Sequence, residues 1–158
     1  MSDFEKRIAE AWASIDDYDT AGFRALIDEL VAELPADSPR AAFERACAFD
    51  STGDSASAIP LYQAALDGGI SGENRRRSVI QMASSIRNTG RPEESVALLT
   101  AELERASDGL DDAVRCVLAL ALTDLGRERE AVSIVVGALA RHLPRYQRSM
   151  AAYARALV

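Results

Sequence analysis

The segment STGD at residues 51–54 decides the fold of this 158-residue chain, because close variants of it recur at a fixed spacing. The variants are NTGR at 88–91 and DLGR at 124–127, and the glycines of successive segments are 37 and 36 residues apart. Asp16 lies 37 residues before the first of these glycines, within IDDY at 15–18, a degenerate form of the same turn. Four equivalent turns at one period are typical of a repeat protein.

Small and large apolar residues keep fixed positions around each turn. A small residue and a larger one three positions later precede it, and another small residue follows it: Ala9, Trp12 and Ala21; Ala46, Phe49 and Ala58; Ala83, Ile86 and Ser95; Ala119, Leu122 and Ala131. This pattern predicts two antiparallel helices joined by a tight turn, because glycine adopts the left-handed conformation that ends a helix without steric cost. The small residues mark the places where the two helix backbones come closest.

Hydrophobic periodicity supports a helix on both sides of each turn. Phe23, Ile27 and Leu30 are spaced by four and three residues, as on one face of a helix. Ser38 followed by Pro39 is a helix start signal, and no alternating strand pattern of useful length is present. The sequence therefore predicts an all-α fold in a single domain over residues 1–158, with repeats at about 3–36, 38–69, 71–106 and 108–141.

A ninth helix is expected after the fourth repeat. Tyr146, Met150 and Tyr153 recur at helical spacing, continue to Leu157 and define one face. The last repeat of a solenoid must cover its apolar end with an element that tolerates water on its outer side. We therefore expect a capping helix at residues 144–157, packed through that face.

Composition limits the classes of protein to which the chain can belong. Hydrophobic residues make up 48% and charged residues 27%, which is typical of a soluble globular protein. The longest apolar runs, Cys116–Leu122 and Ile134–Ala140, have seven residues, far fewer than a membrane span needs. The net charge of −7 argues against nucleic-acid binding, which requires a basic surface. We therefore expect neither a membrane nor a nucleic-acid partner.

Two features of the sequence indicate a cytoplasmic protein. The N-terminus enters a charged helical pattern at once and carries no secretion signal. Cys47 and Cys116 lie far apart in apolar helical stretches, so they are expected to pack as reduced thiols rather than to form a disulfide or a metal-ligand pair.

No set of residues predicts catalysis. His142 is the only histidine, and the sequence supplies no partner that would set its tautomer. The stretch DGGISG at 67–72 lacks the lysine and the spacing of a phosphate-binding loop. Asp16, Asp17 and Asp19 lack the ligand spacing of a calcium loop. We therefore expect a protein that is not an enzyme and has no catalytic residues, cofactor or metal site.

The stretch AFERACAFDSTG at 42–53, followed by AIPLY at 58–62, resembles the tetratricopeptide repeat. The chain resembles in particular the small stand-alone bacterial proteins of that family, which have no attached domain. The resemblance is clear for the second, third and fourth repeats and weaker for the first. It implies a right-handed α-α superhelix of four helix-turn-helix repeats and a capping helix.

The resemblance also implies a binding surface, because in this family the first helix of each repeat lines a concave groove. The positions of this chain that match the groove, and are therefore candidates for contact with a peptide or protein, are Arg40, Phe43, Glu44, Cys47, Arg77, Ile80, Gln81, Ser84, Arg87, Asn88, Cys116, Leu120 and Asp124.

These observations predict a non-catalytic scaffold that binds a segment of another protein in its concave groove. Phe43, Ile80 and Leu120 would supply apolar anchors. Three arginines would select an acidic partner: Arg40, Arg77 and Arg87. The alternative is a self-associating structural module, for example a homodimer. Residues 1–40 carry ten acids and four bases, whereas residues 121–158 carry three acids and six bases, so the two ends could attract one another between subunits. The apolar fourth repeat is then either core or interface.

Overall fold

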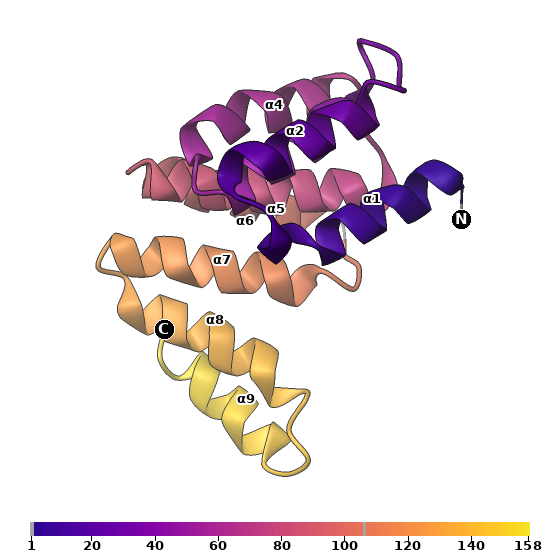
Figure 1. The fold of residues 1–158 in the computed structure, drawn as a ribbon. Helices are drawn as coiled ribbons and strands as arrows, with labels where there is room; N and C mark the ends of the chain where they lie inside the picture. The colour runs from indigo at the N-terminus through magenta and orange to yellow at the C-terminus, as the bar shows by residue number, and fades with distance from the viewer. Residues whose placement is uncertain (1, 106) are drawn as a thin grey trace. The chain divides into compact units, whose positions relative to one another are not determined.

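A computed structural model describes residues 2–105 and 107–158, and in these ranges every regular element is helical (Figure 1). The elements are α1 (Asp3–Ala13), the 3-10 helix η1 (Ile15–Asp17), α2 (Thr20–Val31), α3 (Pro39–Ser51), α4 (Ser55–Asp67), α5 (Gly72–Asn88), α6 (Pro92–Arg105), α7 (Asp111–Asp124), α8 (Glu128–Ala140) and α9 (Gln147–Arg155). The prediction of an all-α fold is confirmed. The expected end of the third repeat, residue 106, lies outside the described residues.

The three glycine turns end their helices in the same way. Gly53, Gly90 and Gly126 have φ angles of +86°, +81° and +70°, a left-handed conformation that side chains with a Cβ adopt only at a cost. At each turn the next amide N–H donates to the carbonyl five residues earlier, for example from Asp54 to Phe49 over 2.9 Å. This bond defines the Schellman motif and satisfies a carbonyl at the helix end. The first turn has no glycine, and η1 replaces the motif there.

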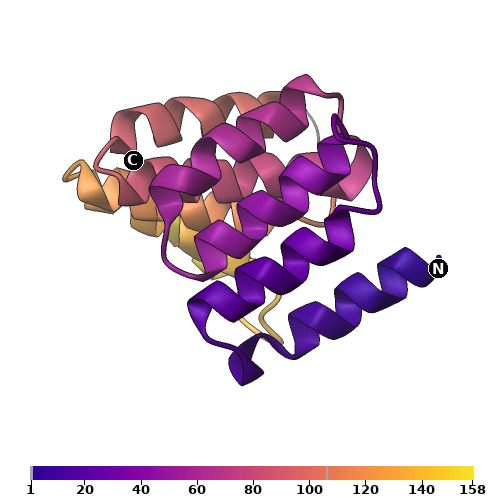
Figure 2. The same cartoon turned by 45° about the horizontal axis from the view of Figure 1, so that its top comes forward.

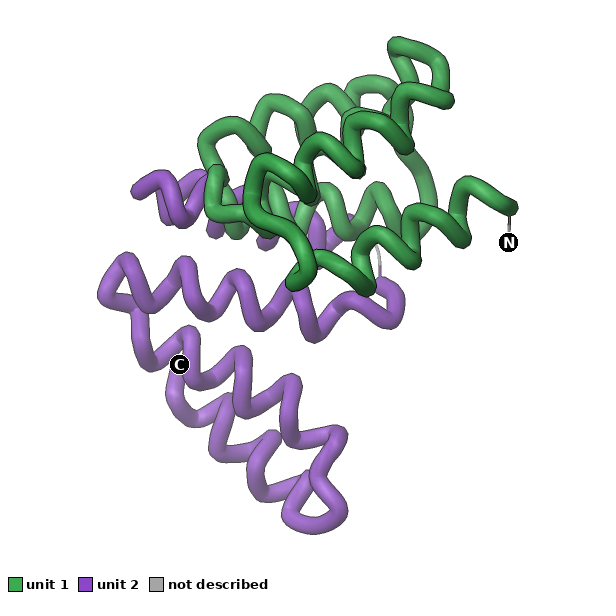
Figure 3. Tube along the Cα trace, in the orientation of Figure 1, with its two compact units in different colours: residues 1–85 green, residues 86–158 purple. Residues whose placement is uncertain are grey.

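The structure divides into two compact units, residues 1–85 and residues 86–158 (Figure 3). In the first unit consecutive helices pack on one another, as the indigo-to-magenta ribbons of Figure 2 show. The small residues Ala46 and Ala58 are fully buried where α3 meets α4, as the repeat pattern predicts. The single domain over residues 1–158 stays a prediction.

The first hairpin departs from the predicted packing. Ala9 and Ala21, expected at the close approach of α1 and α2, are exposed, and Ile8 and Ala11 are buried instead. This part of the pattern is therefore wrong. The physical reason lies in the turn, because η1 takes the place of a glycine turn and the buried face of α1 shifts by one residue.

In the first unit, α3 and α5 lie side by side with residues about one repeat apart in contact. Cys47 Sγ lies 3.6 Å from Gln81 Oε1, and the Ser85 hydroxyl donates to Asp50 Oδ1 over 2.8 Å. These pairs are separated by 34 and 35 residues in the sequence. The first helices of the second and third repeats are therefore neighbours, which is the arrangement that a stack of hairpins requires.

In the second unit, α7 packs on α8 and α8 packs on α9. Ala154 is the buried residue of α9, and its carbonyl accepts a hydrogen bond of 2.8 Å from the Ser133 hydroxyl on α8. The tyrosines expected on the packed face, Tyr146 and Tyr153, are exposed. The expectation is wrong for the two tyrosines, whereas Met150 and Leu157 of the same predicted face are half-buried. The small side chain of Ala154 lets α9 approach α8 more closely than a tyrosine would allow.

Candidate functional site: an apolar groove between two helices

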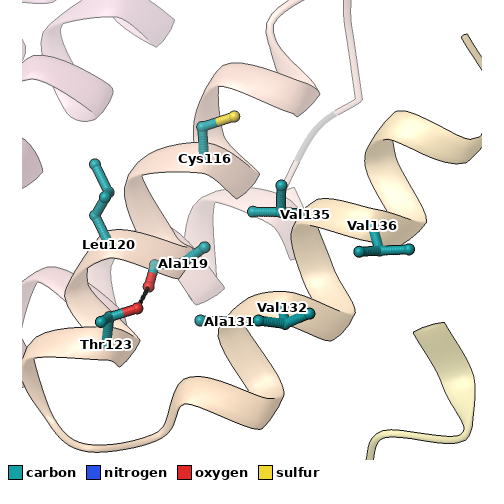
Figure 4. A pocket seen from close by; sticks show the side chains of 8 residues that line it. All are labelled: Cys116, Ala119, Leu120, Thr123, Ala131, Val132, Val135 and Val136. Carbon is teal, nitrogen blue, oxygen red and sulfur yellow. Dashed lines mark hydrogen bonds between the residues drawn. The ribbon is translucent and has the colours of Figure 1, made fainter.

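An apolar groove lies on the second unit between α7 and α8. Its volume is about 390 Å³, and we call it the α7/α8 groove. Its lining residues are almost all aliphatic (Figure 4): Cys116, Ala119, Leu120, Thr123, Ala131, Val132, Val135 and Val136. The groove can therefore accept apolar side chains and offers little to a charged ligand.

The groove follows from the same small residues that define the repeat. Ala119 on α7 and Ala131 on α8 are buried, so the two helices come close together there. Larger side chains of α8, Val132 and Val135, also line the groove, and Figure 4 shows Val135 extending toward α7. A helix that is apolar around most of its circumference cannot bury every face against its neighbours. The faces that remain line the groove.

Several side chains that flank the groove are exposed. Leu120 is 51% exposed, Val132 is 49% and Val135 is 38%. Leu139, one turn beyond Val135 on the same helix, is 52% exposed. Clustered exposed aliphatic residues on a folded protein mark an interaction surface, because covering them removes apolar area from water.

The polar atoms in the groove are not poised for chemistry. The Thr123 hydroxyl donates to the Ala119 carbonyl over 2.9 Å, a bond within α7 that is drawn as a dashed line in Figure 4. Cys116 is an exposed free thiol. Among the described residues, no group of three or more His, Cys, Asp or Glu side chains is arranged to hold a metal ion.

Two of the three cations predicted to select an acidic partner, Arg40 and Arg87, are engaged with acids of the chain itself. Arg40 lies 2.7 Å from a carboxylate oxygen of Glu5 and 2.7 Å from one of Glu44. Arg87 forms an ion pair with Asp124, with Nε 2.6 Å from Oδ2. An acidic partner would have to displace these carboxylates.

Glu44 is buried and accepts hydrogen bonds from other residues of the first unit. Its Oε1 accepts from Arg40, and its Oε2 accepts from the indole N–H of Trp12 over 2.9 Å. Both oxygens therefore have donors of the same unit, and a protein partner has no access to them.

The other candidates from the second and third repeats are mostly core. Phe43, Cys47 and Ile80 are buried. Gln81 and Ser84 are half-buried, whereas Arg77 and Asn88 are exposed. The guanidinium carbon of Arg77 lies 5.1 Å from the centroid of the Phe43 ring, a cation–π contact.

The Cys47 thiol is unreactive at neutral pH. Burial raises the pKa of its thiol to about 12, so the reactive thiolate does not form at neutral pH. The Tyr62 hydroxyl lies 3.7 Å from its sulfur and also donates to Asp50 over 3.3 Å. Cys47 therefore acts as a small core residue.

The sequence prediction considered only positions on the first helix of each repeat, so it missed the groove residues that lie on a second helix. It identified Cys116 and Leu120 on α7, but Val132, Val135 and Val136 come from α8, a second helix. A signal for Val135 and Val136 was present in the sequence. The run Ile134–Ala140 is apolar at seven consecutive positions, and one packed face cannot hide all of them.

His142 contacts Asp112 at the start of α7, with Nε2 2.8 Å from Oδ2. Hydrogen bonds from Arg141 and then His142 hold the pKa of Asp112 well below its usual range. Both residues are on the surface, and they join the end of α8 to the start of α7. A search of the described helices finds none with the length and apolar character needed to cross a membrane.

Comparison with known proteins agrees with this architecture. Residues 39–157 match the family model described as tetratrico peptide repeat. A crystal structure of the "Podosopora anserina putative kinesin light chain nearly identical TPR-like repeats" superposes with a TM-score of 0.70 and 18% sequence identity, over 97% of this chain and 90% of that chain. This likeness shows the fold, an α-α solenoid of the TPR-like class. No curated protein matches the sequence. The family match starts at the second repeat and covers most of the chain, and the chain therefore belongs to the tetratricopeptide repeat family.

Proposed function

We propose that this protein is a non-catalytic interaction module and that the α7/α8 groove binds an apolar segment of another protein. The tetratricopeptide repeat fold generally mediates protein–protein interaction. The observation that carries the proposal is the set of half-exposed aliphatic side chains, Leu120, Val132 and Val135, around one groove.

The energetics of burial favour such a partner. Completely burying a Leu or Val side chain stabilises a complex by about 1.5–3 kcal/mol, and roughly half of that remains to be gained by Leu120 and Val132. Interfaces concentrate their affinity in a few such anchors at the centre of the contact. Losing that gain at one anchor should therefore weaken binding about fourfold to twelvefold.

The members of the predicted concave-groove set that solvent reaches remain in the proposal, and they include the half-buried Arg40, Gln81, Ser84 and Arg87. Cys116 and Leu120 line the α7/α8 groove, and Asp124 lies at the end of the same helix. Arg77 and Asn88 are exposed and are retained as candidate contacts on their own units. Buried side chains of the set are left out, because a partner cannot touch them without unfolding the repeat.

We place this interaction in the cytoplasm. Cys47 and Cys116 are both free in the structure, and unpaired cysteines are typical of proteins that work in a reducing compartment. Fractionation of the native cells, followed by detection of the protein in the soluble or the exported fraction, tests this part of the proposal.

The test is affinity capture from native lysate with wild-type protein and with Val135→Asp. A carboxylate at position 135 would be buried without a partner in the complex, so we expect the captured protein to be lost. Val158→Asp is the matched control, because Val158 is an exposed valine that does not line the groove. Equal capture by both variants, with circular dichroism showing both folded, would contradict the proposed site.

A further inference from the structure

A second cavity of the second unit lies at the start of α9 and differs chemically from the α7/α8 groove. Its volume is about 560 Å³, and its lining has two guanidinium groups, two phenol rings and no carboxylate: Pro144, Arg145, Tyr146, Gln147, Arg148, Ser149, Ala152 and Tyr153. We call this surface the α9 face. Tyrosine and arginine are the residue types that interfaces favour.

The charges of the α9 face are not neutralised by the chain. Arg127 pairs with Glu130, and Arg141 pairs with Asp112. Within the described ranges, by contrast, no ion pair includes Arg145 or Arg148. These two cations are therefore available to an acidic partner, unlike Arg40 and Arg87.

The tyrosines of the α9 face are held outward. Tyr146 is 74% exposed and Tyr153 is 64% exposed. Tyr146 also has a φ angle of +69°, and it is the one non-glycine residue with a positive φ among those described. A residue with a Cβ is strained in that conformation, and strained residues cluster at binding sites.

The chain carries an acidic segment that complements this surface. Asp16, Asp17, Tyr18 and Asp19 form the turn before α2, and all four residues are exposed. In the described part of the chain, no ion pair includes Asp16 or Asp17. Residues 1–40 have a formal charge of −6 (four bases and ten acids), whereas residues 121–158 have +3 (six bases and three acids).

We propose that the α9 face binds the acidic turn Asp16–Asp19 of a second copy of this chain. Guanidinium groups pair with carboxylates through short charge-assisted hydrogen bonds, and the exposed Tyr18 can pack against the tyrosines of the α9 face. The contact joins unlike surfaces, so two reciprocal contacts close a dimer, and contacts that do not close build a longer assembly. Exposed charge pairs are screened by salt, so the association must weaken as ionic strength rises.

Self-association through the α9 face does not require the α7/α8 groove. Val135→Asp should abolish partner capture without changing self-association, and charge reversal on α9 should do the opposite. Failure of one proposal is therefore distinguishable from failure of the other.

The experiment is sedimentation equilibrium of the full chain, with protein concentration varied in low salt and in about 1 M salt, where the Debye length is about 3 Å. We expect the average mass of the wild type to exceed that of the monomer in low salt and to fall toward it in high salt. Arg145→Glu with Arg148→Glu should be monomeric, and Asp16→Arg with Asp17→Arg should be monomeric as well. An equimolar mixture of the two double variants should associate again, because each now carries the charge that the other needs.

Two further variants keep the test specific. Arg155→Glu reverses a charge on the same helix outside the cavity and should leave the association within about twofold of the wild type, since weakly placed surface charges contribute little. Tyr146→Gly relieves the positive φ, so it should keep or raise Tm while weakening association. A wild type that stays monomeric at every concentration in low salt, or a mixture that fails to associate, would overturn the inference.

Discussion

Arg87 and Asp124, which are 37 residues apart in the sequence, form an ion pair in which Nε lies 2.6 Å from Oδ2 and Nη2 donates to Oδ1 over 3.1 Å. Each residue lies in the last turn of its helix, Arg87 in α5 and Asp124 in α7. Their separation equals the period of the glycine turns to within one residue. Asn88 is the residue equivalent to Asp124, so the ion pair joins positions that differ by one residue in the repeat pattern.

The first prediction concerns this ion pair. Arg87→Gln should lower the free energy of unfolding by no more than about 1 kcal/mol, because both side chains are partly exposed and water screens the pair. The cost should shrink further in high salt. Urea titration at two salt concentrations measures it, with Arg91→Gln as the control for a more exposed pair. A loss of 2 kcal/mol or more, on the scale of a buried ion pair, would contradict this account.

The second prediction concerns the glycine turns. Gly90→Ala should destabilise the protein by about 1 kcal/mol, because alanine at φ +81° places a Cβ against its own backbone. Gly109→Ala is the matched control, since Gly109 does not have a positive φ and its new Cβ would meet nothing within 4 Å. We expect that variant to be neutral or slightly stabilised. Thermal unfolding measures the Tm of both variants, and equal Tm values would contradict the left-handed conformation of Gly90.

Most of the fold could be predicted from the sequence because its signals are local. The glycine at position 53 and Pro39 at the start of α3 act within a few residues of themselves, and both helix boundaries agree with the prediction. The first hairpin was harder because no glycine marks its turn. No sequence signal near Ala9 indicates that Ile8 and Ala11 are the buried residues of α1.

The candidate site was less predictable because exposure depends on what neighbouring helices cover. Phe43 and Leu120 are both apolar and both match groove positions of the family, yet Phe43 is buried and Leu120 is half-exposed. The difference arises from long-range contacts, such as that of Arg77 with the Phe43 ring. Arg40 likewise pairs with Glu5, which is 35 positions away in the sequence. Hydrophobic periodicity does not predict such a contact between distant polar residues.

The third prediction concerns the buried carboxylate of Glu44. Glu44→Ala should lower the free energy of unfolding by about 3 kcal/mol, because it leaves the Trp12 indole N–H without an acceptor and removes a partner of Arg40. Glu10→Ala, at an exposed position of α1, should change it by less than about 0.5 kcal/mol. Denaturant unfolding followed by Trp12 fluorescence reports both. A cost below 1 kcal/mol for Glu44→Ala would show that the network is not stabilising.

The fourth prediction concerns the two thiols. At pH 8 iodoacetamide should modify the exposed Cys116 rapidly and leave Cys47 intact, because burial raises the pKa of Cys47 to about 12. Mass spectrometry of peptides measures the ratio, and Cys116→Ala should remove nearly all labelling of the folded protein. Equal labelling at both positions would contradict the buried environment of Cys47.

The raised pKa of the Cys47 thiol makes the free energy of unfolding depend on pH above about pH 9. The Cys47 thiol keeps its proton in the folded state up to about pH 12, whereas in the unfolded chain it ionises near pH 9. The unfolded state therefore binds fewer protons above pH 9, and stability falls as the pH rises beyond that value. Cys47→Ala should flatten this part of the pH profile. An unchanged slope between pH 9 and 11 would count against the shift.

Site-specific photo-crosslinking is the most direct test of the interaction account. A photoreactive phenylalanine analogue replaces Val132 in the α7/α8 groove and, in a separate protein, Gln63 on the exposed side of α4. Irradiation in native lysate should join a distinct protein to the chain labelled at position 132 and not to the chain labelled at position 63. Identical products from both positions, or no product from position 132, would contradict the claim that this groove is where the protein binds its partner.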